Sequence, residues 1–130
     1  MRISILTIFP DFFPPALGEG MIRAARERQK LAVDVVQLRD FTDDSHRSTD
    51  DYPFGGGVGM IMKVEPIDRA LTSLSVGAKG ERPDGTRVVL LSPQGRRFSQ
   101  DLAIEYATLA HLVLVCGRYK GVDERVSDRL

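Results

Sequence analysis

The stretch that decides the fold is Leu112–Cys116, with the sequence Leu-Val-Leu-Val-Cys, followed directly by Gly117–Gly121, Gly-Arg-Tyr-Lys-Gly. An unbroken apolar run of this length predicts a strand buried on both faces, which is typical of a parallel sheet. The two glycines then end the strand and allow the backbone to approach a ligand closely. A last helix is expected to begin near Val122, because Val122, Val126 and Leu130 recur at four-residue spacing.

Three earlier segments have the same apolar character, and helical patterns separate them. The expected strands are Ile3–Phe9, Leu31–Leu38 and Arg87–Leu91. The expected helices are Asp11–Gln29, broken at its prolines and glycines, then Glu65–Leu74, and a third that runs from the N-cap Ser99 to Thr108. Strands that alternate with helices predict one α/β domain over residues 1–130, with a mostly parallel sheet and flanking helices.

The composition is that of a globular domain and argues against several classes of protein. Lys plus Arg and Asp plus Glu number 18 each, so bulk positive charge is not expected to hold nucleic acid. Cys116 is the single cysteine, which excludes an intrachain disulfide and favours a cytoplasmic, reducing compartment. No apolar run approaches the roughly 20 residues of a membrane-spanning helix, so no membrane partner is expected.

The usual nucleotide-binding motifs are absent. No G-x-G-x-x-G follows the first expected strand, where Phe9-Pro10-Asp11-Phe12 stands instead, and no G-x-x-x-x-G-K-[ST] occurs. This disfavours dinucleotide-binding Rossmann enzymes, P-loop NTPases and the methyltransferases that carry a glycine loop after their first strand. The two histidines, His46 and His111, come with no nucleophile-elbow sequence and give no convincing Ser-His-Asp set.

Two successive expected strands end in glycine-bearing loops, Leu91–Gly95 and Gly117–Gly121. Because the ligands of open α/β sheets bind at the carboxyl ends of strands, this pair predicts a ligand site. The alternative is that both loops are ordinary strand-to-helix turns, which glycine commonly punctuates. Arg96 and Arg97 follow the first loop, and they either contact phosphate or begin a solvated helix.

The polar segment Arg39–Gly59 ends in the glycine run Gly55–Gly59, Gly-Gly-Gly-Val-Gly. A loop of this length is often functional, and we expect the glycine run to act as a lid over a bound substrate. The alternative is a flexible connection without function. His46 is a candidate base, although a single loop histidine is more commonly structural. Asp50 and Asp51 match no standard metal site by their spacing, and no metal is expected.

Three segments, in this order along the chain, together resemble one family. The first is Ile8-Phe9-Pro10, and the second is the block from Arg39 to Met60 with Asp50-Asp51-x-Pro53-x-Gly55-Gly56-Gly57. The third joins Leu91–Gly95, Leu-Ser-Pro-Gln-Gly, to Cys116–Arg125, Cys-Gly-Arg-Tyr-Lys-Gly-Val-Asp-Glu-Arg. The combination is similar to the bacterial tRNA (guanine-N1)-methyltransferases over essentially the whole chain.

The resemblance implies a SPOUT fold, an α/β domain with a deep trefoil knot whose loops bind S-adenosylmethionine. It also implies a homodimer with its active site at the subunit interface, and methylation of guanine N1 at position 37 of tRNA, the guanosine 3′ of the anticodon. The cofactor-binding residues would be Leu91, Ser92, Pro93, Gln94, Gly95, Gly117, Tyr119, Lys120 and Gly121. A substrate loop would contain Asp50, Pro53, Gly55, Gly56, Gly57 and Gly59.

The family's general-base aspartate, its third cofactor loop and its tRNA-binding domain would all lie beyond Leu130. On this interpretation residues 1–130 are the amino-terminal portion of a longer protein, end before the knot is complete and are inactive alone. Lys120 departs from the family, which usually has glutamate at that position, and reverses the local charge. The alternative interpretation is a small non-catalytic α/β module that binds a nucleotide or serves as a scaffold.

Overall fold

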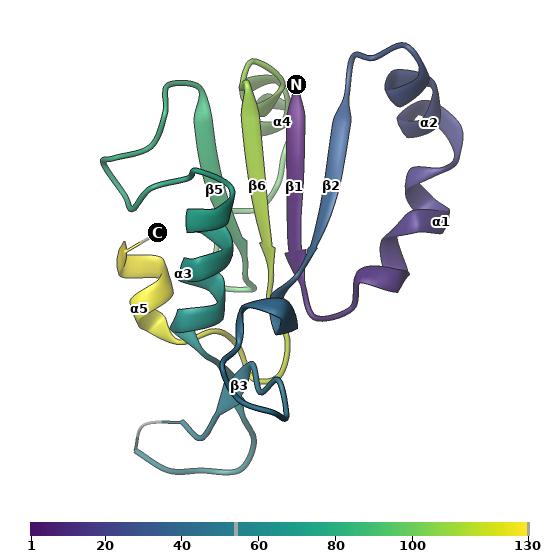
Figure 1. Ribbon diagram of the computed structural model, residues 1–130. Helices are drawn as coiled ribbons and strands as arrows, with labels where there is room; N and C mark the ends of the chain where they lie inside the picture. Colours follow the sequence, from purple (N-terminus) through teal and green to yellow (C-terminus); the bar gives the residue numbers. More distant parts are fainter. Residues whose placement is uncertain (54, 130) are drawn as a thin grey trace.

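A computed structural model describes residues 1–53 and 55–129, and its centre is a four-stranded sheet in the order β2-β1-β6-β5 (Figure 1). All three strand pairs are parallel, which confirms the predicted sheet. The four strands occupy the apolar runs singled out in the sequence. They are β1, Arg2–Thr7; β2, Ala32–Gln37; β5, Thr86–Leu91; and β6, His111–Cys116.

The two central strands, β1 and β6, carry the continuous apolar runs because each is covered on both faces. In the register of the sheet, Ile5 of β1 lies opposite Leu114 of β6 and Val35 of β2. Leu91, the last residue of β5, lies opposite Cys116, the last residue of β6. The two strands therefore end level with each other, and the loops that follow them begin at the same edge of the sheet.

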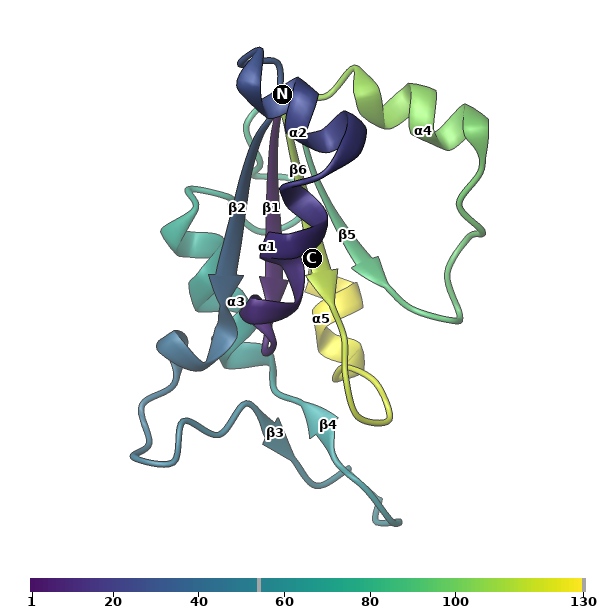
Figure 2. The same ribbon diagram turned by 90° about the vertical axis from the view of Figure 1, so that its right-hand side faces the viewer.

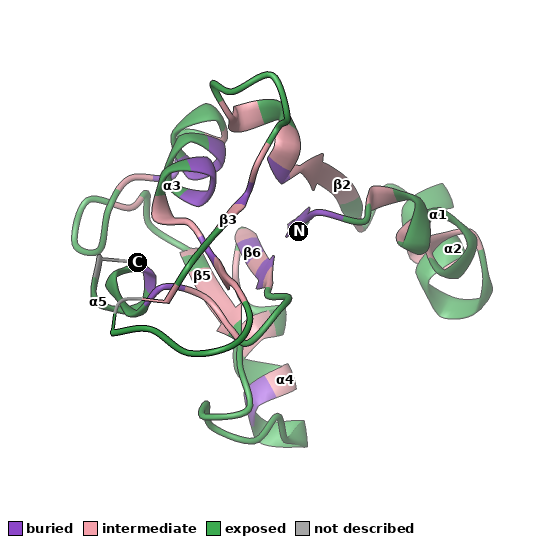
Figure 3. Ribbon diagram, turned by 90° about the horizontal axis from the view of Figure 1, so that it is seen from below, coloured by how far each residue is buried: buried purple, intermediate pink, exposed green. Residues whose placement is uncertain are grey.

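Helices cover the sheet unequally. The helices α3, Val64–Ser73, and α5, Glu124–Arg129, pack together over one face, whereas α4, Gln100–Ala107, lies on the other side (Figure 2). Beyond the β2 edge stand α1, Phe13–Leu17, and α2, Gly20–Glu27, as the view from below shows (Figure 3). In the part of the chain that the structure describes, no helix is long and apolar enough to cross a bilayer.

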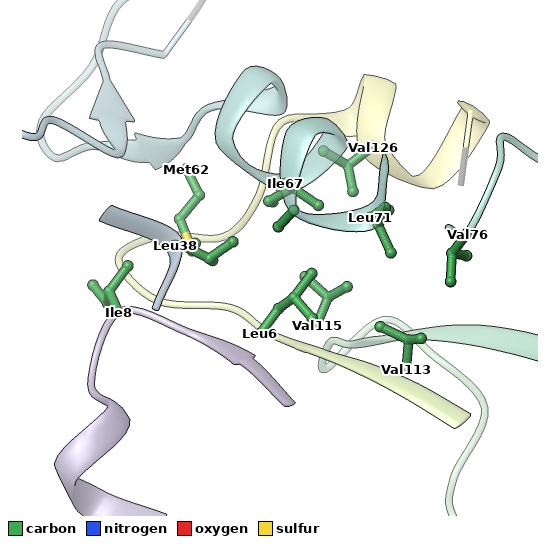
Figure 4. Packing of buried hydrophobic residues seen from close by; sticks show 11 residues of the cluster. Leu6, Ile8, Leu38, Met62, Ile67, Leu71, Val76, Val113, Val115 and Val126 are labelled. Carbon is green, nitrogen blue, oxygen red and sulfur yellow. The ribbon is translucent and has the colours of Figure 1, made fainter. Parts of the chain in front are cut away.

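The main hydrophobic core lies between the sheet and α3 with α5 (Figure 4). Leu6 of β1 and Val115 of β6 are fully buried and face Ile67 of α3 and Val126 of α5. Met62 closes the core near the carboxyl ends of the strands. Burial of such side chains contributes about 1.5–3 kcal/mol each, which makes this layer the main source of stability.

The starts of two helices confirm their predictions, one of them with a shift of two residues. Ser99 is the N-cap of α4, since its hydroxyl accepts the backbone N–H of Leu102 at 3.3 Å. The last helix, expected near Val122, begins two residues later at Glu124, because Val122 itself forms a parallel bridge with Met62. Asp123 precedes the first residue of α5, Glu124, and Leu130 lies outside the described residues.

The segment Arg39–Gly59 is more ordered than a plain loop. It begins within the 3-10 helix η2, Leu38–Phe41, which directly follows β2. A similar 3-10 helix, η1, Pro10–Phe12, comes shortly after β1. The short strand β3, Asp50–Asp51, pairs antiparallel with β4, Ile61–Met62. The resulting hairpin projects beyond the carboxyl end of the sheet, with the glycine run at its tip (Figures 1 and 2).

Candidate functional site

A cavity of about 640 Å³ lies at the carboxyl ends of β5 and β6. Its walls are the loops that follow β5 and β6, together with the start of α5. This is the place where open parallel sheets bind ligands, and the volume falls within the roughly 300–1,000 Å³ usual for small-molecule sites. We call it the strand-end cavity. Its lining residues are Leu90, Leu91, Ser92, Pro93, Gln94, Gly95, Gly117, Arg118, Tyr119, Lys120, Gly121, Val122, Asp123, Glu124 and Ser127.

All nine residues predicted to bind the cofactor line this cavity. The structure thus brings the two predicted loops together, while their binding role stays a prediction. Sequence reasoning missed Leu90, Arg118, Val122 and three polar residues in α5 or directly before it. The sequence did contain a signal for the three polar residues, because Asp123 is of a type common at helix N-caps and lies two residues after the glycine loop. These three residues are Asp123, Glu124 and Ser127.

The loop after β6 is fixed by backbone hydrogen bonds to the β3–β4 hairpin. The N–H of Lys120 donates to the carbonyl of Met60 at 3.1 Å, and the N–H of Met62 donates to the carbonyl of Gly121 at 3.0 Å. The N–H of Asp123 then donates to the carbonyl of Met62, also at 3.0 Å. The loop therefore runs beside β4 like a short additional strand.

The side chains of the same loop contact different elements. The guanidinium of Arg118 lies over the ring of Phe9, 5.5 Å from its centroid, at cation–π distance. The hydroxyl of Tyr119 donates to a carboxylate oxygen of Asp50 at 3.2 Å. The aliphatic chain of Lys120 lies against Gly59, where an added Cβ would be 2.7 Å from Lys120 Cε.

Asp123 is a buried charged residue that lines the cavity. Its carboxylate accepts two hydrogen bonds from the Arg125 guanidinium, at 2.9 and 2.7 Å, and one from the Arg125 backbone N–H at 3.0 Å. The side-chain hydrogen bonds lower the pKa of Asp123 below its ordinary value, so this carboxyl is ionised near neutral pH. Cys116, half-buried at the end of β6, has its pKa raised by desolvation and stays a thiol.

The six residues predicted to form a substrate loop lie on the hairpin and not in the wall of the strand-end cavity. Two of them approach it through the contacts of Asp50 with Tyr119 and of Gly59 with Lys120. Gly56 closes a turn by donating its N–H to the carbonyl of Pro53 at 3.1 Å. The glycines of this run, Gly55, Gly56, Gly57 and Gly59, all have positive φ.

A second cavity of about 510 Å³ lies between η2, the hairpin and α3. Arg69 donates two hydrogen bonds to Asp43 across it, at 2.6 and 2.5 Å, and this pairing lowers the pKa of Asp43. Hydrogen bonds from Ser48 likewise lower the pKa of Asp44. Because these charged groups are already paired within the protein, they offer few unsatisfied groups to a ligand. Asp123 is the one residue that lines both this cavity and the strand-end cavity among the described residues.

Other candidates from the sequence lie elsewhere. His46 is exposed in the loop before β3 and lines neither cavity. His111 shares a hydrogen bond of 2.8 Å with Ser4, but Ser4 is fully buried and cannot reach a substrate. Arg96 lies 3.9 Å from Glu105 on the exposed surface. Within residues 1–53 and 55–129, no group of three His, Cys, Asp or Glu side chains is placed to hold a metal ion.

The fold and the cavity define a parallel α/β domain with a ligand site at the carboxyl ends of two adjacent strands. The chain belongs to the tRNA (guanine-1)-methyltransferase TrmD family, whose model matches residues 1–130.

Two curated relatives named tRNA (guanine-N(1)-)-methyltransferase illustrate the match. The protein of Desulforudis audaxviator is 50% identical over 128 residues, which cover 98% of this chain and 50% of the relative. That of Moorella thermoacetica is 48% identical over 126 residues, which cover 97% and 49%. The chain thus spans about half the length of the curated relatives it matches.

The fold is also that of a solved member. The crystal structure of the tRNA (m1G37) methyltransferase from Aquifex aeolicus matches with a TM-score of 0.81 at 31% sequence identity. The match covers 98% of this chain and 56% of that one. A mostly parallel sheet with flanking helices in this arrangement is therefore the fold of the family.

Proposed function

We propose that this chain is the cofactor-binding part of an enzyme that transfers a methyl group from S-adenosylmethionine to guanine N1 of tRNA. The methylated nucleoside would be the guanosine at position 37. The observation that carries the proposal is the strand-end cavity, in which the two loops predicted from sequence meet in a member of this family. No observation favours the non-catalytic alternative.

The chemistry of the cavity fits S-adenosylmethionine. Leu90, Leu91 and Pro93 would provide apolar wall for the adenine, while backbone groups of the glycine loops would hydrogen-bond to its edge. Glu124 lies in the cavity wall, where its carboxylate would hold the amino or hydroxyl groups of such a ligand. When bound, the cofactor would supply an electrophilic methyl group on a sulfonium.

The chain's own residues would act by binding and orientation. Guanine N1 carries a proton at neutral pH, so a base must remove it as the nitrogen attacks the methyl carbon. We assign that base to an aspartate outside residues 1–130. Holding the two reactants in line supplies much of the rate, because a bimolecular step becomes effectively unimolecular. The hairpin with Asp50, Pro53, Gly55–Gly57 and Gly59 would lie over the base.

The proposal includes three further features: a tRNA substrate, a homodimer whose interface holds the active site, and a cytoplasmic location. The balanced charge of the chain implies that tRNA is held through shape and a few placed cations. Lys120 is one such cation at the cavity wall. Its ammonium can only donate hydrogen bonds, so it cannot supply the carboxylate that the family usually has there.

The complete gene product, incubated with methyl-labelled S-adenosylmethionine, should methylate a tRNA transcript with G at position 37 and not one with A. A matched pair of glycines tests the cavity, since Gly121 and Gly80 both have positive φ and no neighbour that a Cβ would meet. Gly121→Val should weaken cofactor binding roughly tenfold through backbone strain, and Gly80→Val, in a surface loop, should not. Absence of labelled tRNA, or equal labelling of both transcripts, would contradict the proposal.

A further inference from the structure

We propose that Tyr119 is a positioning residue that couples occupancy of the strand-end cavity to the glycine run Gly55–Gly59 through its hydrogen bond to Asp50. The inference rests on the proposed function in one respect, namely that the cavity is where the cofactor binds. It goes further in assigning a route between the bound cofactor and the hairpin that would lie over the substrate base.

The first contact joins the cavity wall to the near stem of the hairpin, which is the strand β3 that precedes the glycine run. Tyr119 lines the cavity and has φ of +61°, a left-handed conformation that non-glycine residues rarely adopt. Such a conformation persists where the surroundings hold it, and the hydroxyl of Tyr119 donates to Asp50 Oδ1 at 3.2 Å. Asp50 belongs to β3, five residues before the glycine run begins.

The second contact joins the next residue of the same wall to the far stem of the hairpin, residues 59 and 60, which lead into β4. The N–H of Lys120 donates to the carbonyl of Met60 at 3.1 Å, and the Lys120 side chain crosses over Gly59. The loop after β6 and β4 run beside each other in Figure 2. Two consecutive cavity residues, Tyr119 and Lys120, therefore fasten both stems of the hairpin tip.

The tip between these two contacts has few restraints of its own. An added Cβ at Gly55, Gly56 or Gly57 would meet nothing within 4 Å among the described residues, and all three have positive φ. A segment with few packing contacts takes its position from its stems. A ligand that favours one arrangement of Tyr119 therefore favours one arrangement of the tip as well, which is a shift of population between states of the hairpin.

The geometry separates cofactor binding from this coupling. The Tyr119 hydroxyl is committed to Asp50, so Tyr119→Phe removes the link and leaves the aromatic ring in the cavity wall. Asp50→Asn keeps an oxygen acceptor for the hydroxyl, whereas Asp50→Ala removes it. The conservative change should thus preserve the coupling that the alanine change abolishes, a pattern that a general loss of structure would not produce.

Hydrogen exchange measured by mass spectrometry on the complete gene product tests the link, with amides 55–60 followed in the presence and absence of S-adenosylmethionine. The wild-type protein and Asp50→Asn should show exchange slowed about fivefold by the cofactor, the size expected when one hydrogen bond is stabilised. Tyr119→Phe and Asp50→Ala should show no slowing, and the double variant Tyr119→Phe/Asp50→Ala should equal either single variant. Amides in the surface loop 77–85 serve as the internal reference.

Calorimetry in the same samples distinguishes the two levels of the proposal. If S-adenosylmethionine does not bind the wild-type protein, the proposed function fails and the coupling falls with it. If it binds the wild-type protein without slowing exchange at 55–60, or slows it equally in Tyr119→Phe, the coupling is overturned and the proposed function stands. Methyl transfer gives a second readout, in which Tyr119→Phe and Asp50→Ala should raise KM for tRNA and Asp50→Asn should not.

Discussion

The side chain of Lys120 packs on the backbone of Gly59, 61 residues earlier in the chain, so closely that a side chain at the glycine would have to displace the lysine. A Cβ at Gly59 would lie 2.7 Å from Lys120 Cε and 3.0 Å from Lys120 Cδ. The contact holds the tip of the hairpin against the wall of the strand-end cavity. Gly59 has a positive φ of +105°, and the aliphatic carbons of Lys120 lie against its backbone.

The first prediction concerns this contact. Gly59→Ala should displace the Lys120 side chain and accelerate hydrogen exchange at the Lys120 amide, which donates to Met60. Gly57→Ala is the matched control, because Gly57 has a similar φ of +114° but open space around it. The control carries the backbone strain of about 1–3 kcal/mol without the clash. Equal acceleration in both variants would show that packing against Lys120 has no role.

The second prediction concerns the start of α5. Asp123 accepts the backbone N–H of Arg125, so Asp123→Ala should lower the free energy of unfolding by about 1 kcal/mol, as for other N-caps. Asp123→Asn keeps an acceptor oxygen and should lose less. Urea denaturation followed by circular dichroism measures the difference. Asp128→Asn, at an exposed position of the same helix, should change stability by less than about 0.5 kcal/mol.

The third prediction concerns the core beneath α3. Leu6 is fully buried, and Leu6→Ala should lower the free energy of unfolding by about 2–5 kcal/mol, since it removes apolar contacts and leaves a cavity. Ile104 on α4 is 58% exposed, and Ile104→Ala should cost much less. Guanidinium titrations of the two variants give the comparison. A similar cost at both positions would contradict the assignment of the core to the α3 side of the sheet.

The fourth prediction concerns pH. Desolvation, with a smaller effect of the Arg2 charge and an opposing effect of Asp34, lowers the pKa of His111 below its ordinary value of 6.5. The unfolded chain therefore takes up a proton at a higher pH than the folded one. Stability should fall as the pH drops below about 6.5, and this loss should level off below the folded pKa.

Thermal melts between about pH 5 and 8, on either side of the ordinary histidine pKa of about 6.5, measure the slope of stability against pH. His111→Gln should flatten it, because glutamine keeps a polar partner for Ser4 but does not titrate. An unchanged slope in His111→Gln would assign the pH dependence to other groups.

Local sequence signals predicted most of the elements. The four apolar runs became β1, β2, β5 and β6 within one or two residues at each end. The signal was clearest for the central strands β1 and β6, because a strand buried on both faces needs an unbroken apolar run. Ser99 marked the start of α4 through its hydroxyl. The start of α5 lies two residues later than apolar spacing predicted, because tertiary pairing with Met62 keeps Val122 out of the helix.

The sequence by itself determined the parallel α/β class, the two glycine loops and the family to which the chain belongs. These features depend on residues near one another in the chain or on motifs in a fixed order. The tertiary structure alone decided the strand order β2-β1-β6-β5, which sets the ends of β5 and β6 level and so creates the cavity. It also decided the contact of Tyr119 with Asp50, 69 residues apart, because such contacts follow from the path of the backbone and leave no local pattern.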